Sequence, residues 1–265
     1  MLLQEPDDRE RWRRRCSVAV SILLLAITFT ATLSLASEPR VRAGVVRRIR
    51  AAQSSIATKP TATTKLRVPF LRQEHALSCE VATLRMVLAY RGTAVTEAKL
   101  LTAVGLDPAR RAGNVFVGLA PRSSKGAKWG DPDEAFVGDV DGIMGKTGYG
   151  VHAGPIGRVA GQYRRAEVIA NGTAAMLAEA IANGNPVIAW GYLGSGRPLR
   201  WQTLGGKDIR AIDGEHTRVV IGYTGTREAP TGFFAIDPVY GEQYWKTEKF
   251  MANWEKLGRS GVVVY

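Results

Sequence analysis

The sequence predicts an α+β domain, with helical and sheet parts segregated along the chain. The 265 residues are 45% hydrophobic and 23% charged, so the chain can build a sizeable core. Helical patterns come first, and apolar strand-like runs separated by turn residues dominate the later part. Strands that follow one another in this way predict antiparallel pairing rather than a repeating βαβ fold.

Two helices are expected early in this domain. Apolar residues at helical spacing predict a mostly buried helix over residues 78–90, with Ser78 as its N-cap and Gly92 as its stop. A second helix is expected over residues 96–104, with Thr96 as its cap. Both predictions depend on a residue that can satisfy the unpaired amides at a helix start.

The middle of the domain gives weaker signals than its ends. Many glycines and prolines leave regular structure between residues 107 and 165 unassigned. Four aspartates there, Asp131, Asp133, Asp139 and Asp141, fit no EF-hand spacing and are interpreted as turn residues. The other expected elements are an extended segment or short strand at 66–71, helices at 173–182 and 250–257, and strands at 186–192, 216–223, 232–236 and 261–265.

An uncharged apolar run, CSVAVSILLLAITFTATLSLAS, occupies residues 16–37 and is about as long as a bilayer-spanning helix. Three arginines precede it, so the positive-inside rule places residues 1–15 in the cytoplasm. Small residues near its end also resemble a signal-peptide cleavage site. Residues 16–37 are therefore expected to be a transmembrane anchor or a signal peptide, and either would export the rest.

A linker is expected over residues 38–65, followed by the folded domain at 66–265. The linker is basic at first and then rich in Ser, Thr and Ala. The chain carries a net charge of +12, and much of the excess lies in basic clusters on either side of the apolar run. This placement favours an anionic membrane surface over nucleic acid as the partner of the charge.

Cysteine usage leaves one thiol in the folded part. Cys16 lies in the apolar run, so Cys79 cannot form an internal disulfide in the exported domain. If Ser78 caps the helix, Cys79 lies in its first turn, where the helix dipole favours a thiolate. The alternative is a small hydrophobic side chain that fills a gap in the core.

A cysteine nucleophile needs a base and a group that orients the base. His216 opens an apolar strand-like run and is the best placed of the three histidines, the others being His75 and His152. Asp237 follows the next strand and could fix the imidazole tautomer. Gln73, six residues before the cysteine, could donate its amide N–H to an oxyanion. Taken singly, each residue also has an ordinary structural interpretation.

The order Gln73, Cys79, His216, Asp237 is that of papain-like cysteine peptidases. The stretch VPFLRQEHALSCEVATLRMVLAYRG resembles the start of peptidase family 39, whose best-known members process double-glycine leader peptides of bacteriocins. The later EHTRVVIGYTG and FFAIDPVYG resemble its His and Asp segments. The resemblance covers about residues 66–265 and implies a nucleophile at Cys79, a base at His216, an orienting Asp237 and an oxyanion donor at Gln73.

One position differs from the family pattern. The family usually has a glycine and then a small residue or proline after its nucleophile, whereas this chain has Glu80 and Val81. A glutamate beside the thiol opposes thiolate formation unless it points away or pairs with Arg85. The chain also has no GxxxxGK[ST] motif, so the resemblance does not extend to the ATPase of transporter-linked members.

The sequence therefore predicts a membrane-anchored or exported thiol hydrolase that cleaves peptide bonds. We expect a peptide or protein substrate, attachment to the membrane through the N-terminal helix, no nucleic acid, no cofactor and no metal; the oligomeric state stays open. One alternative is a non-catalytic binding module on the same fold, with Gly-rich residues 107–165 as the binding region. Another is acyl transfer by a transglutaminase-like crosslinker.

Overall fold

The computed structural model describes residues 63–107, 116–117 and 127–265. The chain divides into two units, Met1–Pro60 and Thr61–Tyr265, and all the described residues belong to the second. The expected cytoplasmic segment, the apolar segment 16–37 and the linker up to residue 62 lie outside the described residues. Within the described ranges, no helix has both the length and the apolar character needed to cross a bilayer.

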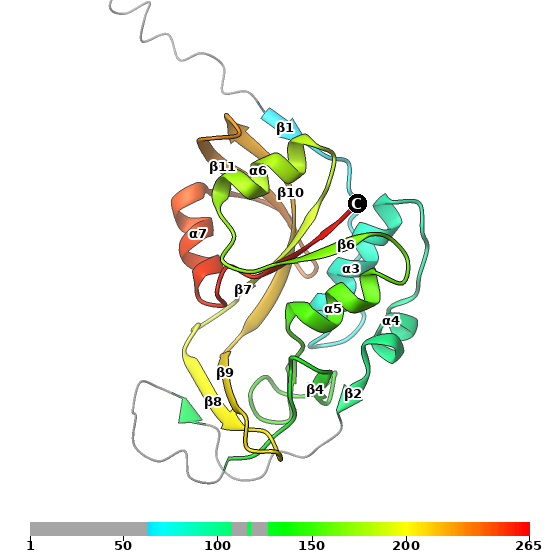
Figure 1. The fold of residues 1–265 in the computed structure, drawn as a ribbon, viewed down its shortest axis with the longest axis vertical. Helices are drawn as coiled ribbons and strands as arrows, with labels where there is room; N and C mark the ends of the chain where they lie inside the picture. Colours follow the sequence, from blue (N-terminus) through cyan, green and yellow to red (C-terminus); the bar gives the residue numbers. More distant parts are fainter. Residues whose placement is uncertain (1–62, 108–115, 118–126) are drawn as a thin grey trace, which may run out of the picture. The chain divides into compact units, whose positions relative to one another are not determined.

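A seven-stranded antiparallel sheet forms the centre of the second unit (Figure 1). Its strand order is β12-β11-β10-β7-β13-β6, and β1 pairs with the later half of the long strand β10. The strands are β1 (Thr63–Lys65), β6 (Ala166–Ile169), β7 (Val187–Tyr192), β10 (Glu215–Gly225), β11 (Pro230–Asp237), β12 (Gly241–Lys246) and β13 (Gly261–Val264).

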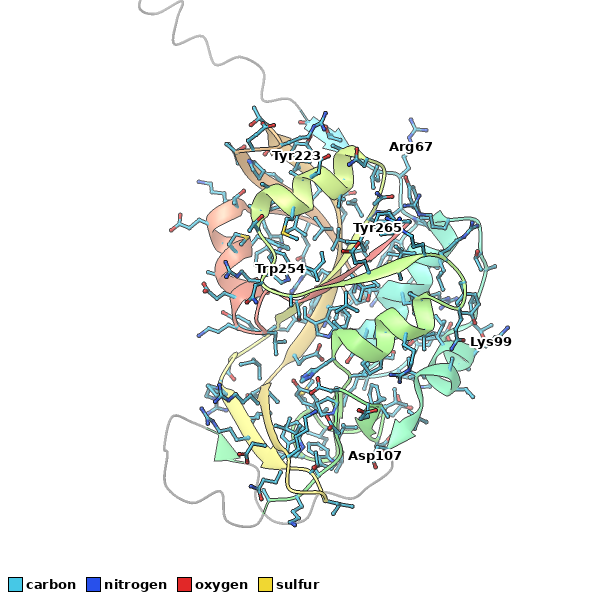
Figure 2. The ribbon with its side chains drawn as sticks, in the orientation of Figure 1. Arg67, Lys99, Asp107, Tyr223, Trp254 and Tyr265 are labelled. Carbon is cyan, nitrogen blue, oxygen red and sulfur yellow. The ribbon has the colours of Figure 1, made fainter. Side chains whose placement is uncertain are left out.

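Helices cover both faces of this sheet. On one face, α3 packs against β10 and β7 and contacts α4 and α5; on the other, α6 and α7 pack against β10, β11 and β7 (Figure 1). The helices are α3 (Cys79–Tyr90), α4 (Glu97–Val104), α5 (Ala153–Ala160), α6 (Ala174–Ala182) and α7 (Thr247–Glu255). The α3 face and the α6/α7 face each have their own hydrophobic cluster, and the second includes Tyr223 and Trp254 (Figure 2).

Two small three-stranded sheets complete the described part. One has the order β2-β4-β5 and the other β3-β8-β9. Their strands are β2 (Leu106–Asp107), β3 (Phe116–Val117), β4 (Phe136–Gly138), β5 (Gly148–Gly150), β8 (Pro198–Gln202) and β9 (Asp208–Ile212). Strand β5 ends beside the start of α3, because the Val151 amide that follows it donates to the Glu80 side chain.

The α+β prediction is confirmed, and the early helices lie close to where periodicity placed them. Helix α3 begins at Cys79, and the Thr96 hydroxyl caps α4 by accepting from the Lys99 amide. Paired structure begins at Thr63, three residues before the expected start of the domain. In the unassigned middle, the structure adds helix α5, which the glycines and proline of AGPIGRVA had concealed.

Five aromatic residues, three in the middle region and two in the later strands β7 and β8, are core. The side chains of Trp129, Phe136, Tyr149, Trp190 and Trp201 are all fully buried. Trp129 and Tyr149 each pack against Trp201, at ring-centroid distances of 5.3 and 5.1 Å. Because these rings are covered, they contribute to the core of the domain.

Candidate active site

Cys79 is the first residue of α3, held there by the polar loop that precedes the helix. Ser78 occupies the N-cap position without a side-chain cap bond. Its hydroxyl instead donates to the buried Glu97 carboxylate, with a second contact to the His75 carbonyl. The loop is thus tied to α4, and the thiol lies at the helix end whose first amides have no intrahelical partner.

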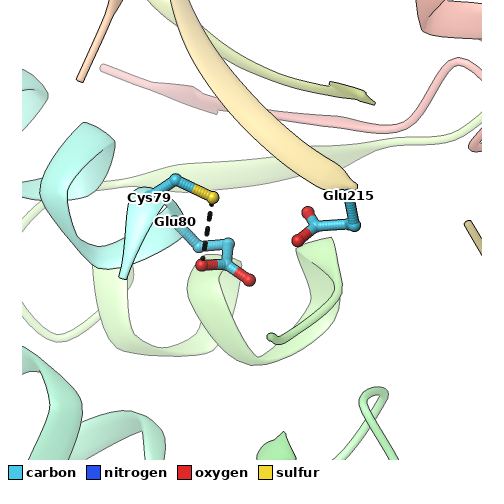
Figure 3. A group of neighbouring side chains, drawn as sticks. All are labelled: Cys79, Glu80 and Glu215. Carbon is cyan, nitrogen blue, oxygen red and sulfur yellow. Dashed lines mark hydrogen bonds between the residues drawn. The ribbon is translucent and has the colours of Figure 1, made fainter. Parts of the chain in front are cut away.

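The sulfur of Cys79 lies beside two buried carboxyl groups (Figure 3). Its thiol donates to Glu80 Oε2 at 3.4 Å, and Glu80 Oε1 accepts from the Val151 amide at 2.6 Å. Glu215, the first residue of β10, brings its carboxyl group to the same place, so that one ligand atom from each of the three residues lies within 4.8 Å of the other two. Among the described residues, no donor other than a proton shared with the Glu80 carboxyl reaches the oxygens of Glu215.

Burial controls the protonation of this cluster. Desolvation raises the pKa of the Cys79 thiol well above its usual value, and the charges of Glu80 and Glu215 raise it further. Desolvation likewise raises the pKa of Glu80 to about 7, against the lowering effect of the Val151 amide. The pKa of Glu215 lies well above its ordinary range, because the group is buried and faces Glu80. At neutral pH the thiol is therefore protonated.

Gly150 makes room for the carboxyl pair. Its φ is +137°, a conformation that side chains rarely adopt, and a Cβ there would overlap Glu80 Oε1 and crowd Glu215 Oε2. The backbone of β5 can approach both carboxyls closely only because the residue is glycine.

His216 and Asp237 lie together, as the sequence predicted. His216 Nε2 lies 2.9 Å from Asp237 Oδ2, and both residues are buried. The other carboxylate oxygen accepts from the backbone amides of Val239 and Tyr240. This arrangement leaves Nδ1 of His216 without a hydrogen-bond partner among the described residues, so it can accept a proton.

Arg218 contacts the same carboxylate oxygen of Asp237 as His216 does. Its Nε lies 3.0 Å from Asp237 Oδ2, and its guanidinium group stacks over the Trp245 ring at 5.0 Å. Burial alone would raise the pKa of Asp237, but the His216 hydrogen bond and charge, the Val239 amide and the Arg218 charge together hold it below its usual value. Burial lowers the pKa of His216. At neutral pH the aspartate is thus ionised and the imidazole neutral.

Cys79 lies against the residues on either side of His216. Its sulfur is near the Glu215 carboxyl, and contacts from Thr217 partly offset the rise in the thiol pKa. Side chains alternate along a strand, so Glu215 and Thr217 face α3 while His216 and Arg218 face Asp237. Within the described part of the chain, no hydrogen bond joins Cys79 to His216.

Gln73 reaches the loop before α3 rather than the thiol. Its Nε2 donates to the carbonyls of His75 and Ala76, at 2.8 and 3.1 Å. Its backbone amide donates to the Pro238 carbonyl at 3.1 Å, which ties the loop to the residue after Asp237. For Gln73 to serve an oxyanion, its side chain would have to leave the two carbonyls.

The glutamate that departs from the family pattern neither points away nor pairs with Arg85. Arg85 instead pairs with Glu74 at 2.5 Å and lies 3.7 Å from Glu97. Glu80 is therefore part of the thiol environment.

Reasoning from sequence missed Glu215 and Arg218. Arg218 was detectable, because a charge inside the apolar run HTRVVIGY needs a buried partner, and Asp237 supplies one. For Glu215 there was no such signal, since an acid at a strand start is normally exposed.

The other polar residues considered from the sequence have structural roles. His75 pairs with Asp141 and His152 with Asp133, at 2.9 and 2.7 Å. Asp131 and Asp139 each accept from the backbone amide two residues later. The aspartates of the middle region are thus confirmed as turn residues.

A helix that begins at a cysteine and packs on an antiparallel sheet defines the class of the molecule, the papain-like peptidase fold. The chain belongs to the Peptidase_C39 like family, whose model matches residues 65–262. The resemblance seen in the sequence is confirmed at this level.

Three relatives illustrate the similarity. The uncharacterized protein YvpB of Bacillus subtilis (strain 168) is 28% identical over 195 residues, which cover 70% of this chain and 68% of YvpB. A crystal structure from Bacillus anthracis, described as a candidate C39-like peptidase, is 25% identical with a TM-score of 0.61, covering 77% of this chain and 98% of that one. A double-glycine-motif protease from an AMS/PCAT transporter, solved with its leader peptide, is 16% identical with a TM-score of 0.40, covering 77% and 94%.

Proposed function

We propose that the chain is a thiol hydrolase that cleaves peptide bonds, with Cys79 as nucleophile, His216 as base and Asp237 as the residue that orients the base. The observation that carries this proposal is the buried pair of His216 and Asp237, in which Nε2 and Oδ2 lie 2.9 Å apart. The Nδ1 atom of His216 has no hydrogen-bond partner among the described residues, and Cys79 lies against Glu215, the residue before His216 on β10. Membership of a peptidase family supports the same reaction class.

Both the thiol and the imidazole are neutral at neutral pH, so the first step differs from attack by a preformed thiolate. His216 Nδ1 would take the thiol proton as the sulfur bonds to the substrate carbonyl. The imidazolium would then pass this proton to the leaving amine as the C–N bond breaks. Water would hydrolyse the thioester and restore the thiol.

This mechanism needs the imidazole to turn toward the sulfur when substrate binds, because His216 faces Asp237 rather than α3 and no hydrogen bond joins it to Cys79 within the described residues. Catalytic hydrogen bonds are often long before substrate arrives and tighten in the complex. The ionised Asp237, held also by Arg218, would stabilise the imidazolium that forms.

Two donors would serve the oxyanion. The Cys79 amide is the first of α3 and belongs to the helix-start amides that have no intrahelical acceptor. Gln73 would supply the second donor after its side chain leaves the His75 and Ala76 carbonyls. Gln73→Ala should then lower kcat by about 10²-fold or more with little change in binding.

The test is hydrolysis of a peptide library by the purified full-length chain, followed by mass spectrometry. Wild-type protein should cleave peptides, and Cys79→Ala should not. Products formed with an added primary amine would separate hydrolysis from acyl transfer, since transfer yields an amide of the added amine. A wild-type chain that cleaves nothing across a broad library would count against the proposal.

A non-catalytic binding module is the second candidate, and one observation favours it. The thiol pKa is raised, whereas reactive cysteines have depressed values. Under this alternative Cys79 would react with electrophiles no faster than a buried thiol in any protein, and His216→Ala would leave its rate unchanged.

We also propose that the domain lies outside the cytoplasm, tethered or released by residues 16–37. The basic flanks and uncharged run support this placement. Protease added to intact cells should digest the domain, and digestion only after lysis would contradict it.

A further inference from the structure

We propose that Cys79, Glu80 and Glu215 form a binding site for Zn²⁺, and that a bound ion holds Cys79 in an inactive state. The binding part concerns these three side chains alone, whereas the inhibitory part rests on the proposed thiol hydrolase function. The sequence predicts no metal site, and the one acidic cluster that it offers, the aspartates at 131–141, fits no EF-hand spacing.

The donor set suits zinc. One thiolate and two carboxylates are typical zinc ligands, whereas Mg²⁺ and Ca²⁺ prefer oxygen alone. Tetrahedral zinc bonds to sulfur and oxygen place these two ligand atoms about 3.5 Å apart. Cys79 Sγ and Glu80 Oε2 already lie 3.4 Å apart, and Glu215 lies within 4.8 Å of both (Figure 3). A small rotation of the Glu215 side chain would complete a three-ligand set.

Glu215 independently indicates a missing ligand. It is 3% exposed, its carboxyl group faces the other two side chains, and among the described residues its hydrogen bond is with the Glu80 carboxyl, through a shared proton (Figure 3). Once that proton is lost, the buried carboxyl group has no partner, which costs roughly 1–3 kcal/mol, more because it is then charged. A cation between the carboxyl groups would remove this cost.

Arg218, the buried basic side chain on the same strand, already pairs with another carboxylate. Arg218 follows Glu215 by three residues on β10, so it faces the opposite side of the strand, where it pairs with Asp237. If all three groups ionised, the cluster would carry three negative charges. Zn²⁺ would reduce this to one.

The surrounding backbone leaves room for the ligand atoms. Gly150 has no side chain at the point where a Cβ would overlap Glu80 Oε1 and crowd Glu215 Oε2. The Val151 amide fixes Glu80 Oε1, which leaves Oε2 directed at the sulfur. The chain thus orients one carboxylate toward the thiol before any ion arrives.

Binding would release protons in a defined way. The Zn–S bond replaces the S–H bond, and the thiol proton, with any proton shared by the two carboxyls, leaves to water. The sulfur lone pair that would attack a carbonyl or an alkylating reagent is then occupied by the metal. Removal of zinc by a chelator would restore the thiol.

The experiment measures protection of Cys79 rather than catalysis. Reduced, chelator-treated full-length chain is alkylated with and without buffered Zn²⁺, and modification of Cys79 is followed by peptide mass spectrometry. We expect zinc to slow alkylation of wild-type Cys79, a chelator to reverse the effect, and Glu215→Gln to need at least about tenfold more zinc for half protection. Glu242→Gln, the same change at an exposed glutamate, should behave as wild type.

Cobalt provides a second readout that does not depend on alkylation. Co²⁺ bound by the thiolate should give a sulfur-to-metal charge-transfer band, which Cys79→Ser should abolish. Unchanged alkylation in excess zinc, or equal protection of wild type and Glu215→Gln, would overturn the site. Peptide cleavage without zinc protection would refute this inference alone. Zinc protection without cleavage would refute the proposed function and the inhibitory role that rests on it, and would leave the zinc site standing.

Discussion

Replacing Glu80 by glutamine should make Cys79 more reactive. Glutamine keeps the shape of the side chain and can still accept from the Val151 amide, but it removes the negative charge that lies 3.4 Å from the sulfur. Desolvation raises the thiol pKa most and would persist, whereas the Glu80 contribution, the next largest, would disappear. The thiolate fraction of Glu80→Gln should therefore exceed that of wild type at any pH where Glu80 is ionised.

The size of the effect follows from the distance. Two unit charges 3.4 Å apart repel by about 5 kcal/mol at an effective dielectric constant of about 20, which is an upper limit for this pair. About 1.4 kcal/mol of this would already change the thiolate population tenfold. Above the Glu80 pKa of about 7, we expect alkylation of Cys79 in Glu80→Gln to be at least about tenfold faster than in wild type.

Iodoacetamide rates over a series of pH values would measure this change, with peptide mapping to separate Cys79 from Cys16. Glu242→Gln is the matched control, because it removes an exposed carboxylate that pairs with Lys65. An equal or slower rate in Glu80→Gln would show that the glutamate does not suppress the thiolate, and the electrostatic account of the cluster would be wrong.

Three further predictions concern stability, each measured by urea unfolding. Burial raises the pKa of Glu80 from 4.5 to about 7, so the free energy of unfolding should fall by roughly 3 kcal/mol as pH rises through that interval. Glu80→Gln should lack this loss, and parallel pH profiles of wild type and mutant would refute the prediction. Gly150→Ala should destabilise the domain by about 2 kcal/mol or more, whereas Gly154→Ala, at an open helical position, should not; similar unfolding midpoints would contradict the role of Gly150. Arg218→Met leaves Asp237 with one fewer buried partner and should cost about 3 kcal/mol, so an unchanged midpoint would argue against the ion pair.

Much of the fold was predictable, because local rules and tertiary packing agree there. Apolar spacing located α3 and α4, and the continuous apolar runs located β7, β10, β11 and β13. Helix α5 was not predictable, since its glycines and proline disfavour a helix in isolation. Val168 packs against the space that a Gly157 side chain would fill, so tertiary contact overrides propensity there.

The site was predictable in its residues but less so in its electrostatics. Strand order placed His216 beside Asp237, as expected for an aspartate at the end of a neighbouring strand. Burial, then Glu80 and then Glu215 raise the pKa of the Cys79 thiol, and Glu215 is far from Cys79 in sequence and is brought to it by the packing of β10 against α3. A one-dimensional pattern does not contain this proximity. Gln73 has the expected sequence position, yet local backbone carbonyls hold its side chain.

The most direct test of the central claim is the alkylation of Cys79 when histidines are removed one at a time. If His216 is the base for Cys79, its replacement by alanine should slow modification of Cys79 by a peptide-like electrophile by about 10²-fold. His152→Ala, which removes an imidazole paired with Asp133, should leave the rate unchanged. Equal rates in wild type, His216→Ala and His152→Ala would contradict the account and favour a binding module.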